Sequence, residues 1–215
     1  MIKGLIIFGD SILAGMGAST RDNNCSKIIK TAINIPVALR ARNRETSRDG
    51  LTRLSRDVLM GPECYHVIVL FGNNDSWLRD DDRPEVSLAE FEQNLNTMIS
   101  QIRHNGQAPI LLNLQPLDRD KFLKRFPIYR DKMKLLGSDP VTWQKQYSEL
   151  VQNLAAKGRV DFIDIRTPME KEITSCIGDD GLHPNDLGHK LIAEVVLGYL
   201  KSVDSSIVVR NSSSR

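Results

Sequence analysis

The sequence of 215 residues has few cysteines, few aromatic residues and little net charge, and each shortage excludes a class of protein. The three cysteines, Cys25, Cys64 and Cys176, lie far apart and form no Cys-x-x-Cys pair. A disulfide framework or a zinc site is therefore not expected, and reduced thiols in a cytoplasmic protein are the default. Aromatic residues make up only 6% of the chain and the net charge is +2, so a nucleic-acid partner is not expected either.

Long hydrophobic runs are also absent. No run approaches the ~20 apolar residues needed to cross a bilayer, so stable membrane insertion is not expected. The apolar stretch of residues 5–8 is too short for a signal-peptide core and leads into a turn rather than a cleavage site. With 40% hydrophobic and 26% charged residues, the composition is that of an ordinary globular domain, which we expect to span residues 1–201. The serine-rich residues 202–215 are expected to form a flexible tail.

Short apolar runs alternate with helical patterns along the chain. Strands are expected at residues 2–8, 33–40, 65–71, 109–114 and 160–165, and helices at 49–59, 87–102, 141–156 and 187–200. Ser87, followed three residues later by Glu90, predicts a capping box at the second of these helices. The alternation predicts a parallel sheet covered by helices on both faces. In such a sheet, reactive groups collect at the carboxyl ends of the strands.

Ser11 directly follows the first predicted strand, in the turn Gly9-Asp10-Ser11. A serine there is either a helix N-cap or an exposed nucleophile whose own backbone N–H faces a developing oxyanion. A serine hydroxyl becomes a good nucleophile when an imidazole takes its proton and a carboxylate orients that imidazole. Asp10 suits a structural role, such as capping the next helix.

His183 is the histidine that best suits that role, because it lies in a loop between Gly181 and Pro184 where packing has no need of an imidazole. Asp180 comes three residues earlier, and a tight turn lets its carboxylate reach Nδ1 of the ring, which leaves Nε2 for Ser11. The alternative is an aspartate that only forms a turn, beside a surface histidine.

Asn74 follows the third predicted strand, two residues after Gly72. Its side-chain amide is a candidate donor to an oxyanion, and the loss of one such donor costs about 3–4 kcal/mol of barrier. The alternative is an ordinary turn, in which asparagine is common.

Taken together, these segments resemble the SGNH (GDSL) hydrolase superfamily. The serine block is Phe8-Gly9-Asp10-Ser11, the asparagine block is Gly72-Asn73-Asn74-Asp75, and the histidine block is Asp180-Gly181-Leu182-His183-Pro184-Asn185. The resemblance covers residues 2 to about 200. It implies an α/β protein with a flavodoxin-like three-layer α/β/α sandwich and a five-stranded parallel sheet. It also implies Ser11 as nucleophile, His183 as general base, Asp180 as its orienting acid and Asn74 as oxyanion donor.

One block departs from the family pattern, because Arg44 stands where the family has a glycine whose backbone N–H completes the oxyanion hole. In one alternative, the Arg44 backbone N–H is still the donor and the guanidinium points into the pocket. In the other, the donor is supplied by Gly50 or is missing. A guanidinium at this position suggests recognition of an anionic part of the substrate. The alternative is that Arg44 pairs with Glu45, Asp49 or another acid.

The sequence therefore predicts a cytoplasmic serine esterase or acylhydrolase of small-molecule esters, with small acyl groups and no metal or organic cofactor. Two alternatives remain. One is an acyltransferase on the same triad, and the other is an inactive ligand-binding module, which is suggested by the replacement of the family glycine by Arg44. A homodimer is possible. Residues 119–134, with seven basic and two acidic side chains, form either a lid over the active edge or a solvated amphipathic helix and loop.

Overall fold

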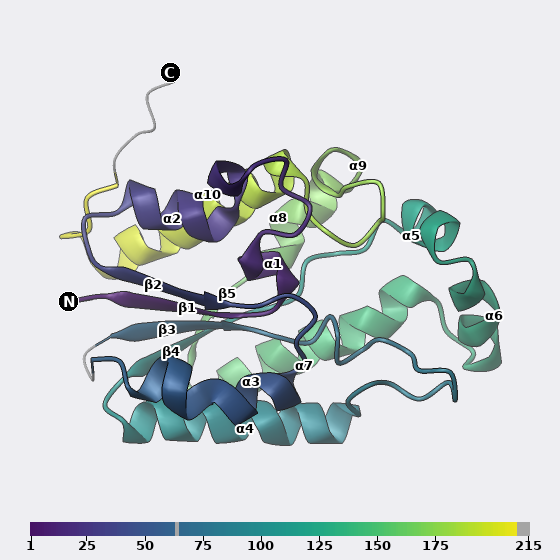
Figure 1. Ribbon diagram of the computed structural model, residues 1–215, viewed down its shortest axis with the longest axis horizontal. Coiled ribbons are helices and arrows are strands. Elements are labelled where there is room, and N and C mark those ends of the chain that lie inside the picture. Colours follow the sequence, from purple (N-terminus) through teal and green to yellow (C-terminus); the bar gives the residue numbers. More distant parts are fainter. Residues whose placement is uncertain (63–64, 210–215) are drawn as a thin grey trace.

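Five parallel strands form a single sheet at the centre of the computed structural model, which describes residues 1–62 and 65–209 (Figure 1). Their order across the sheet is β2-β1-β3-β4-β5. The strands are β1 (Leu5–Gly9), β2 (Val37–Ala41), β3 (His66–Leu70), β4 (Ala108–Leu112) and β5 (Asp161–Ile163). This order with helices on both faces is that of flavodoxin-like proteins, so the predicted fold class is confirmed.

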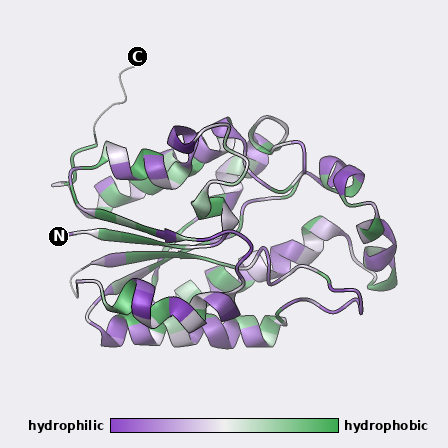
Figure 2. Cartoon of the chain, viewed as in Figure 1, coloured by the Kyte–Doolittle hydropathy of each residue, from purple (hydrophilic) through white to green (hydrophobic). Residues whose placement is uncertain are grey.

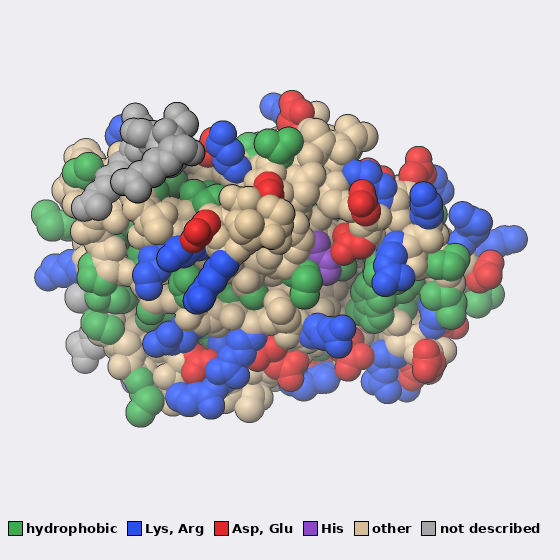
Figure 3. Space-filling view, turned by 45° about the horizontal axis from the view of Figure 1, so that its top comes forward, with side chains coloured by type: hydrophobic (Ala, Val, Ile, Leu, Met, Phe, Trp, Pro, Cys, Tyr) green, Lys and Arg blue, Asp and Glu red, His purple; other side chains and the backbone are tan. Residues whose placement is uncertain are grey.

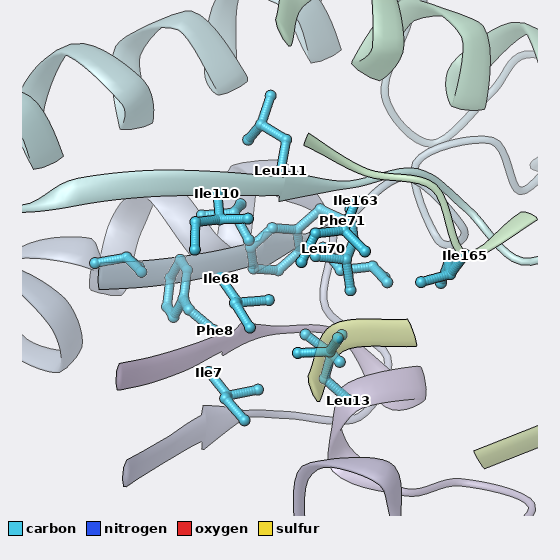
Figure 4. Packing of buried hydrophobic residues seen from close by; sticks show 14 of the residues in the cluster. Ile7, Phe8, Leu13, Ile68, Leu70, Phe71, Ile110, Leu111, Ile163 and Ile165 are labelled. Atoms are coloured by element: carbon cyan, nitrogen blue, oxygen red, sulfur yellow. The ribbon is translucent and has the colours of Figure 1, made fainter. Parts of the chain in front are cut away.

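The central strands are apolar along their whole length because both of their faces are covered. All five residues of β1 are buried, and so are the last four of β3. Figure 4 shows Ile7, Phe8, Ile68 and Ile110 within this core. The Phe8 ring meets the Phe71 ring edge to face, with 5.2 Å between their centroids. Hydropathy follows the same arrangement, since the middle of the sheet is hydrophobic while the helices alternate between hydrophobic and hydrophilic residues (Figure 2).

The helices form two layers, and a third group projects beyond the sheet (Figure 1). One face carries α1 (Ser11–Ala14), α2 (Cys25–Ala32), α8 (Arg166–Lys171), α9 (Ile173–Cys176) and α10 (Asp186–Val203). The other face carries α3 (Ser47–Leu54), α4 (Leu88–His104) and α7 (Pro140–Gly158). The projecting pair is α5 (Arg119–Arg125) and α6 (Ile128–Leu135), which lies beyond the carboxyl ends of the strands.

The strands and long helices occupy the predicted segments, with differences at their ends. The second strand begins at Val37 rather than residue 33, because Pro36 has no N–H to give to the sheet. Ser87 caps α4 as predicted, but the capping box with Glu90 is wrong, since Glu90 instead binds Arg48 at 2.7 Å. A complete capping box is found at α3, between Thr46 and Asp49. Helices α2, α8 and α9 were not predicted.

The predicted flexible tail does not begin at residue 202. Helix α10 continues to Val203, the Asp204 carboxylate accepts a hydrogen bond from the Ile2 backbone N–H, and Ile207 is buried. Residues 202–209 are therefore part of the folded domain, while residues 210–215 and Cys64 lie outside the described residues. In the described part of the chain, no helix combines the length and hydropathy needed to cross a bilayer.

Candidate active site

The predicted site segments follow three neighbouring strands and lie at one edge of the sheet. Gly9, the last residue of β1, pairs with Ala41 at the end of β2 and with Leu70 at the end of β3. The residues that follow these three strands, including Ser11, Arg44 and Asn74, therefore leave the sheet from adjacent positions. Parallel strands align their carboxyl ends, and this accounts for the convergence of segments far apart in the sequence.

Ser11, His183 and Asp180 form a continuous chain of hydrogen bonds. The Ser11 hydroxyl lies 3.1 Å from Nε2 of His183, and Nδ1 of the same ring lies 2.6 Å from Oδ2 of Asp180. An ionised Asp180 accepts only from a protonated Nδ1, so Nε2 is left as the acceptor for the Ser11 O–H. The structure thus brings together the three side chains that the sequence singled out, in the orientation that proton removal from Ser11 requires.

The Asp180 carboxylate is held ionised by its surroundings. Partial burial raises its pKa, but hydrogen bonds from the His183 ring and from the backbone N–H groups of His183 and Leu182 outweigh burial and bring the pKa to about 2. At neutral pH the group carries a full negative charge beside the imidazole. Such a charge stabilises the imidazolium that forms when His183 takes a proton.

The loop that carries Asp180 and His183 is closed on itself and fixed to the start of α5. The Gly178 N–H donates to the His183 carbonyl at 2.8 Å, and the Asp118 N–H donates to the Gly181 carbonyl at 2.9 Å. Gly181 has φ +74°, and a side chain there would collide with the backbone of Phe122 and Asp118. Glycine is therefore required at this position by both conformation and packing.

Asp10, next to the nucleophile candidate, is fully buried and caps α1 as predicted. Its Oδ1 accepts a hydrogen bond from the Ile12 N–H at 3.0 Å, and its Oδ2 accepts from the Asn73 side-chain amide at 3.0 Å. Burial raises the pKa of Asp10 to about 7, and the two hydrogen bonds only partly offset this effect.

A buried polar network extends from Asn73 across the sheet edge. The side-chain Oδ1 of Asn73 accepts hydrogen bonds from the side-chain amides of Gln115 and Gln144, each at 3.0 Å, and Oε1 of Gln144 accepts from Arg166 at 2.8 Å. These bonds hold the segment after β3 in place. The network could not be recognised in the sequence, because its members come from four separate segments.

The structure joins the segments that carry the predicted oxyanion donors Asn74 and Arg44. One hydrogen of the Asn74 amide is donated to the Glu45 carbonyl at 2.9 Å, which leaves the other available to a ligand. In the described residues, the backbone N–H groups of Ser11 and Arg44 have no hydrogen-bond acceptor. Gly50 is not the alternative donor, because its N–H is used within α3 by the Thr46 carbonyl.

Arg44 has φ +61°, a left-handed conformation that is uncommon for residues with a side chain. The position therefore retains the backbone geometry that suits a glycine, and the arginine tolerates it. The Arg44 side chain is exposed and makes no ion pair within the described ranges. Glu45 binds Arg53 at 2.5 Å and Asp49 caps α3, so the partners considered for Arg44 in the sequence are engaged elsewhere.

Asp75 is a second residue that sequence reasoning missed. It is fully buried at the end of the segment after β3, and its carboxylate accepts hydrogen bonds from both the backbone N–H and the hydroxyl of Ser47. Burial raises its pKa to about 6. This contact fastens the start of α3, three residues after Arg44, to the segment that carries Asn74. The feature of the sequence that could have identified Asp75 is its position directly after Asn74 in the turn that follows the third strand.

The projecting helices cover an aromatic cluster beside the site. Trp77, Phe122, Phe126 and Tyr129 pack with ring centroids 4.9–6.1 Å apart, and Leu182, the neighbour of His183, lies against them. A cavity of about 20 Å³ remains between this cluster, Asn73 and Leu182. On the face shown in Figure 3, hydrophobic side chains gather next to the one visible histidine.

Lys132 fixes α6 to the loop that follows Trp77. Its ammonium group is largely buried and donates to the Arg79 carbonyl at 2.5 Å and to Asp82 at 2.9 Å. The segment of residues 119–134 is thus a packed pair of helices at the active edge rather than a solvated helix and loop. No cluster of three metal-binding side chains is found in the residues that the structure describes.

Comparison with known proteins agrees with this geometry. A family model described as GDSL-like lipase/acylhydrolase matches residues 7–191. The uncharacterized lipoprotein YqeF of Bacillus subtilis (strain 168) is 25% identical over 170 residues, which are 74% of this chain and 69% of that protein.

Solved structures with related names share the fold. The lipase/acylhydrolase of Enterococcus faecalis superposes with a TM-score of 0.74 at 24% identity, over 99% of this chain and all of that one. A catalytic mutant of Axe2, an acetylxylan esterase from Geobacillus stearothermophilus, superposes with a TM-score of 0.68 at 19% identity, over 91% and 93% of the two chains.

Proposed function

Because this chain belongs to the GDSL-like lipase/acylhydrolase family, we propose that it hydrolyses carboxylic esters through an acyl-enzyme formed on Ser11. The observation that carries the proposal is the hydrogen-bonded chain from the Ser11 hydroxyl through His183 to Asp180, with distances of 3.1 and 2.6 Å. A hydroxyl in contact with an oriented imidazole is the arrangement that nucleophilic catalysis on an acyl group needs.

In the first half of the reaction, the Ser11 oxygen attacks the ester carbonyl while Nε2 of His183 takes the hydroxyl proton. The negative charge that develops on the carbonyl oxygen is stabilised by the N–H groups of Ser11 and Arg44 and by the free hydrogen of the Asn74 amide. Protonated His183 then gives its proton to the leaving alcohol, and an acyl group remains on Ser11. Asp180 keeps the ring in the correct tautomer throughout.

In the second half, a water molecule replaces the alcohol. His183 takes a proton from the water as it attacks the acyl carbon, and the same three donors hold the second oxyanion. The carboxylic acid leaves and the Ser11 hydroxyl is restored. An alcohol in place of water would turn the same site into an acyltransferase.

We assign recognition of an anionic part of the substrate to Arg44. Its backbone is held at the oxyanion edge through the bond between Asn74 and the Glu45 carbonyl, while its guanidinium is exposed and unpaired within the described residues. A guanidinium binds carboxylate or phosphate through two parallel hydrogen bonds. An inactive module is an alternative because Arg44 replaces the family glycine. The left-handed backbone of Arg44 argues against it, since the position keeps a conformation in which its N–H is available.

We propose that the acyl group is small. The cavity between Asn73, Leu182 and the aromatic cluster is not lined by Ser11 or His183, and at about 20 Å³ it has room for roughly one water molecule, so it offers no space for a long acyl chain. Acetyl esters are therefore the starting substrates.

The test combines active-site labelling with a substrate panel. The parent protein is expected to be labelled by a fluorophosphonate and to hydrolyse p-nitrophenyl acetate faster than the octanoate ester, whereas Ser11→Ala should lose both properties. The panel should include acetylated xylooligosaccharides and lysophospholipids, with an added alcohol to detect acyl transfer. A parent protein that is neither labelled nor active on any ester would exclude the proposal and leave a binding module.

A further inference from the structure

The outer face of the two projecting helices differs from the rest of the surface. We call residues 119–136, which form α5, α6 and the following Leu136, the cap. Its inner face is buried against the domain: Phe122, Leu123, Tyr129 and Met133 belong to the aromatic cluster. Its outer face is the end of the molecule that projects farthest beyond the strands (Figure 1).

Apolar side chains are exposed on this outer face. Ile128 is 59% exposed, Leu135 is 77% exposed and Leu136 is 39% exposed. Ile128 and Leu135 are seven residues apart in α6, so they lie on the same side of the helix two turns from one another. Of the nine large hydrophobic residues exposed in the described chain, three fall within this stretch of nine residues. Such clustering is what distinguishes a binding surface from scattered apolar residues.

The cap also exposes more cations than acids. The exposed basic residues of the cap without an ion pair in the described ranges are Arg119, Lys124, Arg125, Arg130 and Lys134. The exposed acids of the same segment are Asp120 and Asp131. Figure 3 shows blue and green side chains side by side at this end of the molecule, with red side chains among them. Elsewhere many surface arginines are neutralised by neighbours, as Arg48 is by Glu90 at 2.7 Å.

We propose that the outer face of the cap docks on a membrane surface that contains anionic lipid. Ile128, Leu135 and Leu136 enter the headgroup region, and the exposed cations of the cap bind lipid phosphates. A surface that carries both apolar and basic side chains is suited to this interface, where burial of hydrocarbon and attraction to anionic headgroups add together.

The alternative occupants fit this face less well. A second copy of the chain paired through a two-fold axis would place the same five cations near each other with only two acids from each copy to match them. Nucleic acid would use the cations, but exposed isoleucine and leucine side chains contribute neither stacking nor hydrogen bonds to it. The lipid surface is the occupant that uses both halves of the patch.

Docking through the cap would bring the active edge to the lipid. The Asp118 N–H, at the start of α5, is bonded to Gly181 in the loop that carries Asp180 and His183. The cap is thus connected directly to the loop that carries His183, and docking would bring the carboxyl edge of the sheet toward the lipid. The docking itself does not require the proposed function, although its use in catalysis does.

The experiment measures binding without hydrolysis. Ser11→Ala protein is sedimented with vesicles of phosphatidylcholine alone or with an equal amount of phosphatidylglycerol. Binding to the anionic vesicles should be at least about tenfold tighter at about 0.05 M salt and should weaken strongly at about 0.5 M salt, because salt screens headgroup charge. Equal binding to both vesicles, or none to either, would overturn the proposal.

Two cap variants and two matched controls locate the surface. The variants are Ile128→Gln/Leu135→Gln and Lys124→Gln/Arg125→Gln/Arg130→Gln/Lys134→Gln. Each should lose at least about fivefold of the anionic-vesicle affinity. The apolar control is Met60→Gln/Leu187→Gln, whose residues are 82% and 60% exposed away from the cap. The charge control changes four exposed lysines elsewhere to glutamine: Lys30, Lys157, Lys171 and Lys201.

The results separate the docking surface from the active site. Each variant is also made in the Ser11 parent, where hydrolysis of soluble p-nitrophenyl acetate should be unchanged, since the altered side chains point away from the site. If the controls lose vesicle binding as much as the cap variants do, the cap is not the docking surface. If size-exclusion chromatography shows instead a dimer that Leu135→Gln disrupts, the face pairs with a second copy and the lipid proposal is wrong.

Discussion

The side-chain amide of Asn74 donates a hydrogen bond to the backbone carbonyl of Glu45 at 2.9 Å, and this bond joins the segment after β3 to the segment after β2. The same amide has a second hydrogen, which remains for a ligand. Asn74 holds the peptide next to Arg44, and in the proposed mechanism it also stabilises an oxyanion.

Substitution of Asn74 separates these uses. Asn74→Ala should lower kcat for p-nitrophenyl acetate by roughly 10²–10³, because one oxyanion donor contributes about 3–4 kcal/mol to the transition state. Asn105→Ala is the control, since the Asn105 amide makes a similar bond to the Leu59 carbonyl at 2.9 Å far from the site. Both variants should lose about 1 kcal/mol of unfolding free energy in urea titrations. A similar small change in kcat for both would show that Asn74 is only a tether.

The side chain of Arg44 should affect anionic substrates selectively. Arg44→Ala is expected to reduce kcat/KM for a p-nitrophenyl hemisuccinate by about tenfold, the value of one charge-assisted hydrogen bond, with little change for the neutral acetate. Arg44→Gly is the matched variant, because glycine adopts φ +61° without strain and so keeps the backbone N–H in place. Equal losses on the two substrates in both variants would end the recognition hypothesis.

Some of this site could be predicted from the sequence and some could not, for physical reasons. Ser11, Asn74, Asp180 and His183 were accessible because strand ends of a parallel sheet converge and because short loops limit where a side chain can reach. The bond from Asp75 to Ser47 and the network from Asn73 to Arg166 were not, since they depend on tertiary packing between separate segments. Helix propensities likewise gave no means to place the cap beside the histidine loop.

The buried carboxyl of Asp10 should give the protein a pH-dependent stability. Its pKa is about 7 in the folded chain, against 3.8 when solvated, so between these values the native state binds a proton that the unfolded chain has released. The free energy of unfolding therefore falls as pH rises through this window. Asp75, with a pKa raised to about 6, acts in the same direction. His66 and His189, whose pKa values are lowered by burial, act in the opposite direction, so the contribution of Asp10 is measured by comparison with a variant at about pH 5 and about pH 8 in urea titrations.

Asp10→Asn tests the source of that dependence. The variant cannot titrate at this position, so from about pH 5 to about pH 8 its free energy of unfolding should fall less, or rise more, than that of the parent, although it loses one hydrogen bond with the Asn73 amide. Asp22→Asn, at an exposed carboxylate, is the control and should keep the parental pH dependence. An unchanged slope in Asp10→Asn would show that Asp10 is ionised in the native protein throughout this range.

Gly181 and Gly137 form a matched pair for testing how the histidine loop depends on the cap. Both have positive φ, at +74° and +60°, so an alanine at either position pays the cost of a left-handed backbone, about 1 kcal/mol. At Gly137 the new Cβ would meet nothing within 4 Å, whereas at Gly181 it would strike the backbone of Phe122 and Asp118. The difference between the two variants therefore isolates the contact between the loop and α5.

Gly137→Ala should lose about 1 kcal/mol of unfolding free energy and keep its activity. Gly181→Ala should lose more than twice as much, because α5 or the loop must move, and its kcat should fall at least about tenfold as Nε2 of His183 shifts away from the Ser11 hydroxyl. Urea titration and the p-nitrophenyl acetate assay measure the two effects on the same samples. If Gly181→Ala keeps its kcat while it loses stability, the loop holds His183 in position without the support of α5, and the cap and the active site are mechanically independent.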